Sequence, residues 1–168
     1  SREKHPFSRG VQATYSFFNT SFFKAIIMNH LLSRGIAVEN GKILLAHYVE
    51  KGYWFLPGGH IELGESGAAA LVRECKEEMD IDVSNPELLT TFEHAYEDGG
   101  EIQHEITLIY RYEAPKQETI ESQVPHLEFE WVTKDQFGET KFLPRALKDA
   151  IRACMDGEPM PQFVSTLQ

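Results

Sequence analysis

The sequence predicts an α/β fold in which a mixed β-sheet lies between helices. Two observations lead to this expectation. Short apolar segments of strand-like composition occur on both sides of one amphipathic helix, and a second amphipathic helix follows the last of them. The predicted strands cover residues 30–38, 42–49, 87–96, 104–112 and 129–132. With no internal repeat in the chain, we expect residues 28–168 to form one domain and residues 1–27 to be an N-terminal extension.

The connections between these segments have the composition of turns. Asn40-Gly41 is typical of a two-residue hairpin loop, and Asp98-Gly99-Gly100 separates the next pair of strands. The final helix is expected to begin near Pro144, a favourable first-turn residue, and to end at Gly157.

The helix in the middle of the chain has an acidic face. At about 100° per residue, Glu74, Glu77 and Glu78 fall on one side. The other side is expected to be buried through Ala68, Leu71, Val72, Cys75 and Met79. Like charges three and four residues apart destabilise a helix, and a bound cation would reverse that effect. Carboxylate oxygens suit hard ions such as magnesium. A solvated acidic face is the simpler interpretation of the helix alone.

A glycine-rich loop leads into this helix. Pro57-Gly58-Gly59 follows an aromatic run, and glycines allow backbone atoms to approach an ion or a phosphate closely. Ser66 is a suitable N-cap for the helix. Loop and helix are therefore expected to converge on one site.

From Gly59 to Ile81 the chain resembles the signature of the Nudix hydrolases. Gly59, Glu65, Arg73-Glu74 and Glu77-Glu78 match that signature at the required spacing. Asp80 stands where the family usually has Gly, at the residue that ends the helix in a left-handed turn. We expect this departure to cost about 1 kcal/mol of stability and no chemistry. The resemblance implies an α/β/α sandwich with a mixed sheet.

The resemblance also implies a reaction: hydrolysis of the diphosphate linkage of a nucleoside diphosphate derivative, with water attacking phosphorus. The implied cofactor is Mg²⁺, with Mn²⁺ as an alternative. Its implied ligands are Gly58, through its carbonyl, and Glu74, Glu77 and Glu78. Arg73 is expected to orient these carboxylates, and Glu65 to support the same network from the loop.

Many family members use a further Glu outside the signature as a metal ligand or as the base. The candidates are Glu105, Glu121, Glu128 and Glu130. We rank Glu128 first and Glu105 second, and an exposed carboxylate at a strand edge is the alternative for each. The residues assigned to catalysis are thus Arg73, Glu77, Glu78 and Glu128, and those assigned to the substrate are Glu65, Tyr96 and Glu105.

Substrate identity is left open by the sequence. Tyr96 lies 16 residues after Asp80 and resembles a mark of dinucleoside polyphosphate hydrolases, whereas the proline typical of many ADP-ribose hydrolases is absent there. Nucleoside triphosphates and dinucleoside polyphosphates are both retained. The alternative from another class is a catalytically silent Nudix-fold module that binds a nucleotide or a protein.

Composition excludes other partners. The net charge of −10 argues against a nucleic acid polymer, which usually selects a basic surface. No apolar run is long enough to span a bilayer, so we expect no membrane partner. Cys75 and Cys154 fall on apolar helix faces, which fits a reducing, cytoplasmic location. A homodimer is left open, as is the hypothesis that Met28 is the natural start.

Overall fold

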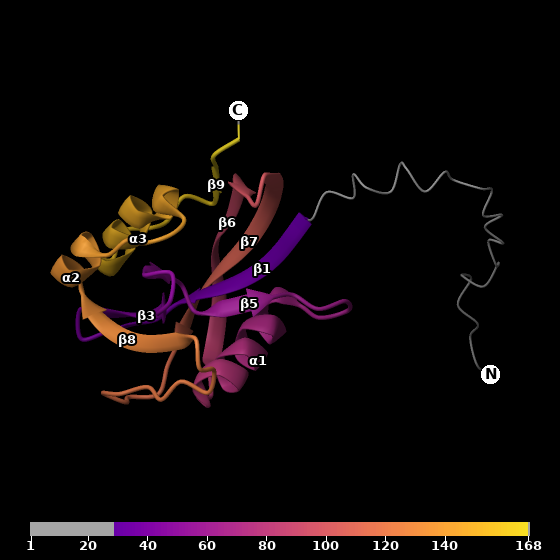
Figure 1. Cartoon of the computed structure of the whole chain (residues 1–168). Coiled ribbons are helices and arrows are strands. Elements are labelled where there is room, and N and C mark those ends of the chain that lie inside the picture. Colours follow the sequence, from indigo (N-terminus) through magenta and orange to yellow (C-terminus); the bar gives the residue numbers. More distant parts are fainter. Residues whose placement is uncertain (1–28, 168) are drawn as a thin grey trace, which may run out of the picture.

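A computed structural model describes residues 29–167. These residues form three layers, in which one helix covers one side of two β-sheets and the remaining helices cover the other side (Figure 1). The predicted α/β/α arrangement is therefore confirmed. The expected extension at residues 1–27 and the expected start at Met28 lie outside the described residues.

The larger sheet has five strands in the order β5-β1-β7-β6-β9. They are β1 (Asn29–Ile36), β5 (Gly58–His60), β6 (Ser84–Asp98), β7 (Glu101–Glu113) and β9 (Phe163–Ser165). The β1/β7 and β6/β9 pairs are parallel, and the other two pairs are antiparallel. The sheet is mixed, as the sequence predicts.

The smaller sheet is built around one central strand. Its members are β2 (Val38–Glu39), β3 (Lys42–Tyr48), β4 (Tyr53–Phe55) and β8 (Leu127–Thr133). Strand β3 pairs in an antiparallel manner with each of the other three. The tight turn before β3 is confirmed, because Asn40 and Gly41 have φ angles of 50° and 74°.

Helix α1 (Gly67–Met79) begins and ends where its capping residues predict. The Ser66 side chain accepts a hydrogen bond from the Ala69 amide at 3.2 Å. At the other end Asp80 is left-handed, with φ 52°, and its amide donates to the Lys76 carbonyl.

The buried face of α1 differs from the predicted one at Val72 and, in part, at Ala68, which is only half-buried. Leu71, Cys75 and Met79 are buried, but Val72 is 37% exposed and Ala70 is buried instead. Gly67 explains the shift, because a Cβ there would lie 2.7 Å from Leu108 on β7. The helix thus approaches the sheet most closely on its Gly67 side, which leaves Val72 at the rim.

The opposite layer consists of α2 (Lys134–Glu139), the 3₁₀ turn η2 (Arg145–Leu147) and α3 (Lys148–Met155). The last two form the final helix expected from Pro144 onward. Helix α2 and strand β9 were not predicted. Thr133 caps α2 in a reciprocal capping box with Gln136.

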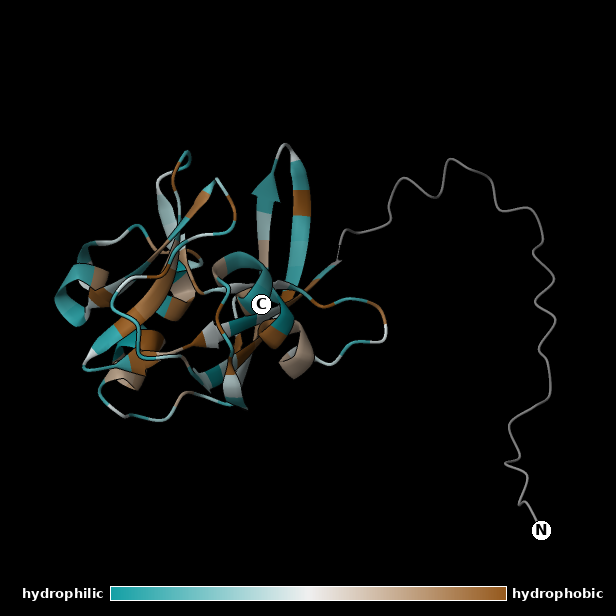
Figure 2. Cartoon of the chain, turned by 90° about the horizontal axis from the view of Figure 1, so that it is seen from below, coloured by the Kyte–Doolittle hydropathy of each residue, from teal (hydrophilic) through white to brown (hydrophobic). Residues whose placement is uncertain are grey.

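Two apolar clusters fill the space between the layers. The cluster under α1 includes Leu71, Cys75 and Tyr112, and the cluster under α2 and α3 includes Phe137 and Ile151. Hydrophobic stretches lie along the strands, whereas most connecting turns are hydrophilic (Figure 2). No helix within residues 29–167 is long and apolar enough to cross a membrane.

Candidate active site

A cleft of about 870 Å³ opens where both sheets meet the segment that precedes α3. This volume is typical of small-molecule sites, which span roughly 300–1,000 Å³. All the layers contribute to its walls. The lining includes Arg34 from β1, Gly58, Gly59 and His60 from β5, Glu74 and Glu78 from α1, Tyr96 from β6, Glu105 from β7, and Arg145 from η2.

A shallower hollow of about 550 Å³ lies across the outer side of α1. Ala69, Val72 and Pro86 line it. It accounts for the exposure of Val72, but it offers mostly aliphatic surface. The 870 Å³ cleft holds the converging polar groups and is the candidate site.

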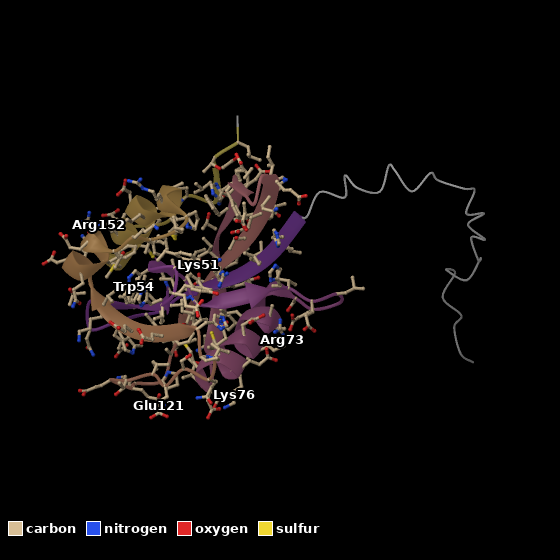
Figure 3. All side chains as sticks on the ribbon, in the orientation of Figure 1. Lys51, Trp54, Arg73, Lys76, Glu121 and Arg152 are labelled. Atoms are coloured by element: carbon tan, nitrogen blue, oxygen red, sulfur yellow. The ribbon has the colours of Figure 1, made fainter. Side chains whose placement is uncertain are left out.

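Arg73 connects the loop to the acidic face of α1 (labelled in Figure 3). Its Nε and Nη2 atoms each donate to one oxygen of Glu65 at 3.0 Å. Its Nη1 atom donates to Glu74 at 3.0 Å and to Glu77 at 3.1 Å, and Nη2 also donates to the His60 carbonyl. This hydrogen-bonded Glu65 carboxylate is the main reason why the pKa of Arg73 is raised above its usual value. The contacts are those expected of a residue that orients carboxylates.

Two glycines allow the loop to approach this network. A Cβ on Gly59 would lie 2.5 Å from the carboxyl carbon of Glu74. Gly58 has φ 120°, and a Cβ there would collide with the Ser33 carbonyl. The loop can therefore lie directly against β1 and against the carboxylate only if both residues are glycine.

Glu78 is a cleft carboxylate that lacks a hydrogen-bond partner for one of its oxygens within the described residues. Its Oε2 atom is buried and has no hydrogen-bond partner within residues 29–167. Burial raises the pKa of Glu78 to about 7, against the opposing positive charge of Arg34. A largely buried acceptor of this kind is costly unless a ligand pairs with it.

Arg34 is a site residue that the sequence reasoning missed. Its Nη1 atom donates to the carbonyls of Leu56, at 3.2 Å, and Gly58. Its guanidinium carbon lies 5.0 Å from the centre of the Phe55 ring. Burial lowers the pKa of Arg34, and the negative charge of Glu105 is the largest opposing influence. The available signal was an arginine within a predicted strand, close to the apolar residues Leu31, Leu32 and Ile36.

The two leading candidates for the additional glutamate lie in different places. Glu105 lines the cleft, where the Thr107 hydroxyl donates to its Oε1 atom at 2.7 Å. Glu128 is not among the cleft residues; its side chain is 59% exposed and lies 3.4 Å from His47. The geometry therefore does not support our ranking of Glu128 ahead of Glu105. Strand alternation groups residues by side, but only the pairing of the strands decides which side meets the cleft.

The other residues predicted to belong to the site also fall into two groups, those that line the cleft and those that lie outside it. Tyr96 lines the cleft, with its ring 5.6 Å from that of His94. Glu65 faces Arg73 and the Glu62 amide, at 3.1 Å, and does not line the cleft. Glu121 lies on the loop before β8, at the lower edge of Figure 3, and is also outside the cleft.

Oxygen donors for a metal are present, although the side chains are not gathered around one point. Within residues 29–167 no three His, Cys, Asp or Glu side chains form a ready-made metal centre, because Glu74 and Glu77 are turned toward Arg73. Glu78, which carries the unpartnered oxygen, and Gly58 line the same cleft. This all-oxygen set fits a hard divalent cation.

Comparisons with known proteins agree with this geometry. A family model described as the NUDIX domain matches residues 29–154. The chain is 39% identical over 64 residues to the uncharacterized Nudix hydrolase YvcI of Bacillus subtilis (strain 168), which covers 38% of this chain and 40% of that protein. It is 45% identical over 73 residues to the 8-oxo-dGTP diphosphatase of Proteus vulgaris, covering 41% of this chain and 65% of that protein. Both matches span less than two thirds of the relative.

A solved structure gives the same result at the level of the fold. The crystal structure of the MutT protein from Bacillus halodurans superposes with a TM-score of 0.63 at 27% identity, covering 78% of this chain and 85% of that chain. Because the family model spans most of the chain and the signature residues either line the cleft or are hydrogen-bonded to it through Arg73, the chain belongs to the Nudix family.

Proposed function

We propose that this protein is a hydrolase that cleaves the diphosphate linkage of nucleoside triphosphates, with Mg²⁺ as its cofactor. The observation that carries the proposal is the convergence of Glu74 and Glu78 on α1 with Glu105 on β7 in one cleft. Three carboxylates in one cleft, one of which has a buried, unpartnered oxygen, would be unfavourable for a mere binding module. They suit a site that recruits a cation together with a phosphorylated substrate.

The metal would be held by the Gly58 carbonyl and by Glu74, Glu77 and Glu78. When bound, it would neutralise the charge of the diphosphate and of the phosphorus under attack. Arg73 is a positioning residue, because its hydrogen bonds to Glu65, Glu74 and Glu77 hold the loop and the helix together.

Glu105 is proposed as the general base. Glu105 lines the cleft, and the hydroxyl of Thr107 donates a hydrogen bond to one of its carboxylate oxygens. The other oxygen is then free to take the proton of the attacking water. Glu128, which lies outside the cleft, is not needed for this role.

The substrate assignment rests on two observations. The similarity to a protein named 8-oxo-dGTP diphosphatase favours nucleoside triphosphates, ordinary or oxidised. The cleft also offers aromatic surfaces for a base: Tyr48 and Tyr53, 5.7 Å apart, on one wall and Tyr96 on another.

Hydrolysis of a nucleotide panel, with and without Mg²⁺, tests the proposal. Pyrophosphate release from triphosphates is expected only with metal present. Replacing Glu78 by Gln should lower kcat by about a thousandfold, because a metal ligand contributes several kcal/mol.

A matched pair of variants tests the base. Glu105→Gln should lower kcat by about 10²-fold or more, as the loss of a general base does, whereas Glu128→Gln should retain the wild-type rate. The reverse order would reject Glu105 as the base. If the wild-type protein hydrolysed no nucleotide of the panel, a binding module would be favoured instead.

A further inference from the structure

Arg34 holds an oxygen atom that the proposed metal site requires. Its Nη1 atom donates to the carbonyl of Gly58, the backbone ligand assigned to the metal, and to the carbonyl of Leu56. The guanidinium is held at this place by the Phe55 ring, whose centre is 5.0 Å away. While a lone pair of the Gly58 carbonyl oxygen accepts this hydrogen bond from Arg34, the same lone pair cannot bind a cation.

Arg34 also lies within the field of the site's carboxylates. Glu105, Glu78 and Glu74, in decreasing order, each raise the pKa of Arg34, although burial lowers it overall. Among the groups of residues 29–167, this guanidinium alone lowers the pKa of Glu78. The cleft contains two other described cationic residues, Lys51 and Arg145. Lys51 lies over the Tyr48 ring, 5.1 Å from its centre, and neither residue is among the groups that shift the pKa of Glu78.

The other two carboxylates on the acidic face of α1, those of Glu74 and Glu77, form direct salt bridges with a second arginine, Arg73. The Nη1 atom of Arg73 contacts one carboxylate oxygen of Glu74 and one of Glu77. In the part of the chain that the structure describes, the acidic face of α1 is thus balanced by two guanidinium groups, that of Arg73 on the helix and that of Arg34 in the cleft. A divalent cation entering beside Glu78 would meet the positive charge of Arg34.

We propose that Arg34 is a positioning residue that acts as an exchangeable counter-cation. Without substrate it holds the Gly58 carbonyl and balances Glu78. With a metal and a diphosphate both bound, the Gly58 carbonyl would serve as a metal ligand, and the guanidinium of Arg34 would turn to the phosphate oxygens. A guanidinium suits this second contact because its planar donors match phosphate geometry. The inference rests on the proposed function and assigns a regulatory property to the same site.

The consequence is coupling between metal and substrate. The metal alone must displace Arg34 and leave its charge without a partner, so its binding is weak. A diphosphate provides that partner, so metal and diphosphate strengthen each other's binding by the same factor. Removing the guanidinium should therefore tighten binding of the metal alone and reduce the coupling.

Mn²⁺ binding, followed by the electron paramagnetic resonance signal of free Mn²⁺, tests the proposal. Wild type, Arg34→Met and Arg34→Lys are titrated with and without a non-hydrolysable nucleoside triphosphate analogue. Without the analogue, Arg34→Met should bind Mn²⁺ about tenfold more tightly than wild type, a typical coupling factor. Arg34→Lys, which keeps the charge but loses the planar fork, should lie between them. With the analogue, the difference from wild type should shrink or reverse.

Arg111→Met is the matched control, because Arg111 is exposed on β7 and does not line the cleft. It removes the same charge and should leave Mn²⁺ affinity unchanged. Equal or weaker Mn²⁺ binding by a folded Arg34→Met protein, or an equal gain in Arg111→Met, would overturn the proposal. Circular dichroism and thermal unfolding establish that each variant is folded.

A measurement on the unaltered protein covers the case in which Arg34→Met does not fold. The side-chain Nε–Hε resonance of Arg34 should shift when Mg²⁺ and the analogue are added together, and shift less with Mg²⁺ alone. An unchanged resonance at saturation overturns the proposal. These readouts do not require hydrolysis, so a silent nucleotide panel would reject the proposed function while leaving the exchange of Arg34 testable by itself.

Discussion

Glu78 shows how much the chemistry of this site depends on one partly buried carboxylate. Its Oε2 atom is buried and has no hydrogen-bond partner within residues 29–167, and burial raises its pKa to about 7. The neighbouring charges of Glu74 and Glu77 also raise this pKa, and the positive charge of Arg34 opposes them. The sequence placed Glu78 on an acidic helix face, but it did not show that this carboxylate is the one deprived of a partner.

The raised pKa predicts a pH-dependent stability. Because the folded-state pKa of Glu78 lies above the unfolded value near 4.5, the stabilising contribution is complete below that value and is lost as the pH rises through about 7. In metal-free buffer, the free energy of unfolding of wild type relative to Glu78→Gln should therefore fall between about pH 5 and about pH 8. Urea unfolding in the presence of a chelator measures it.

The control for this effect is Glu87→Gln, which alters an exposed carboxylate on β6. Its difference from wild type should stay nearly constant over the same range. A Glu78→Gln difference that stays constant, or rises with pH, would contradict the assignment of a buried carboxylate with a raised pKa.

At the scale of elements, α1 is defined by its own sequence. Ser66 caps its start and the left-handed Asp80 ends it, as the local pattern predicts. Helix α2 and strand β9 could not be found in this way, because they have only six and three residues. Their formation depends on distant partners: Phe137 of α2 is fully buried in the second cluster, and β9 pairs with β6.

Asp80→Gly should stabilise the protein. Glycine removes the strain of a left-handed side chain, worth about 1 kcal/mol, while the lost ion pair with Lys76, 2.8 Å long and exposed, costs only a few tenths. We expect a net gain of about 0.5 kcal/mol in the free energy of unfolding, measured by urea titration.

Asp80→Asn separates the two contributions, because asparagine tolerates the left-handed conformation but cannot pair with Lys76. It should be as stable as wild type or slightly less so. If Asp80→Gly were less stable than Asp80→Asn, the conformational explanation would be wrong.

At the scale of the whole molecule, the distance between α1 and the larger sheet depends on glycine. A Cβ on Gly35 of β1 would lie 2.6 Å from the Cδ1 atom of Tyr112 and 2.9 Å from a methyl group of Leu71. Tyr112 and Leu71 are both buried, so neither can move aside without disturbing the first apolar cluster. Helix α1 and the larger sheet therefore pack closely at Gly35, a position that no local sequence pattern predicts.

Gly35→Ala should accordingly lower the free energy of unfolding by about 2 kcal/mol, the cost of overpacking a core. Gly138→Ala is the control, because Gly138 lies on α2 with open space around it. That change should be neutral or stabilise by up to about 1 kcal/mol. Equal stability of the two variants in thermal unfolding would show that the layers can separate at Gly35.

The sequence by itself determined the features that depend on near neighbours. The spacing of Arg73, Glu74 and Glu78 on α1, the caps of that helix and the turn at Gly41 follow from helical period and backbone preference, which are local properties. Only the tertiary structure decided that Glu105, and not Glu128, lines the cleft and that Arg34 holds the Gly58 carbonyl. Strand pairing sets those positions by joining residues far apart in the chain, and no short sequence period encodes it.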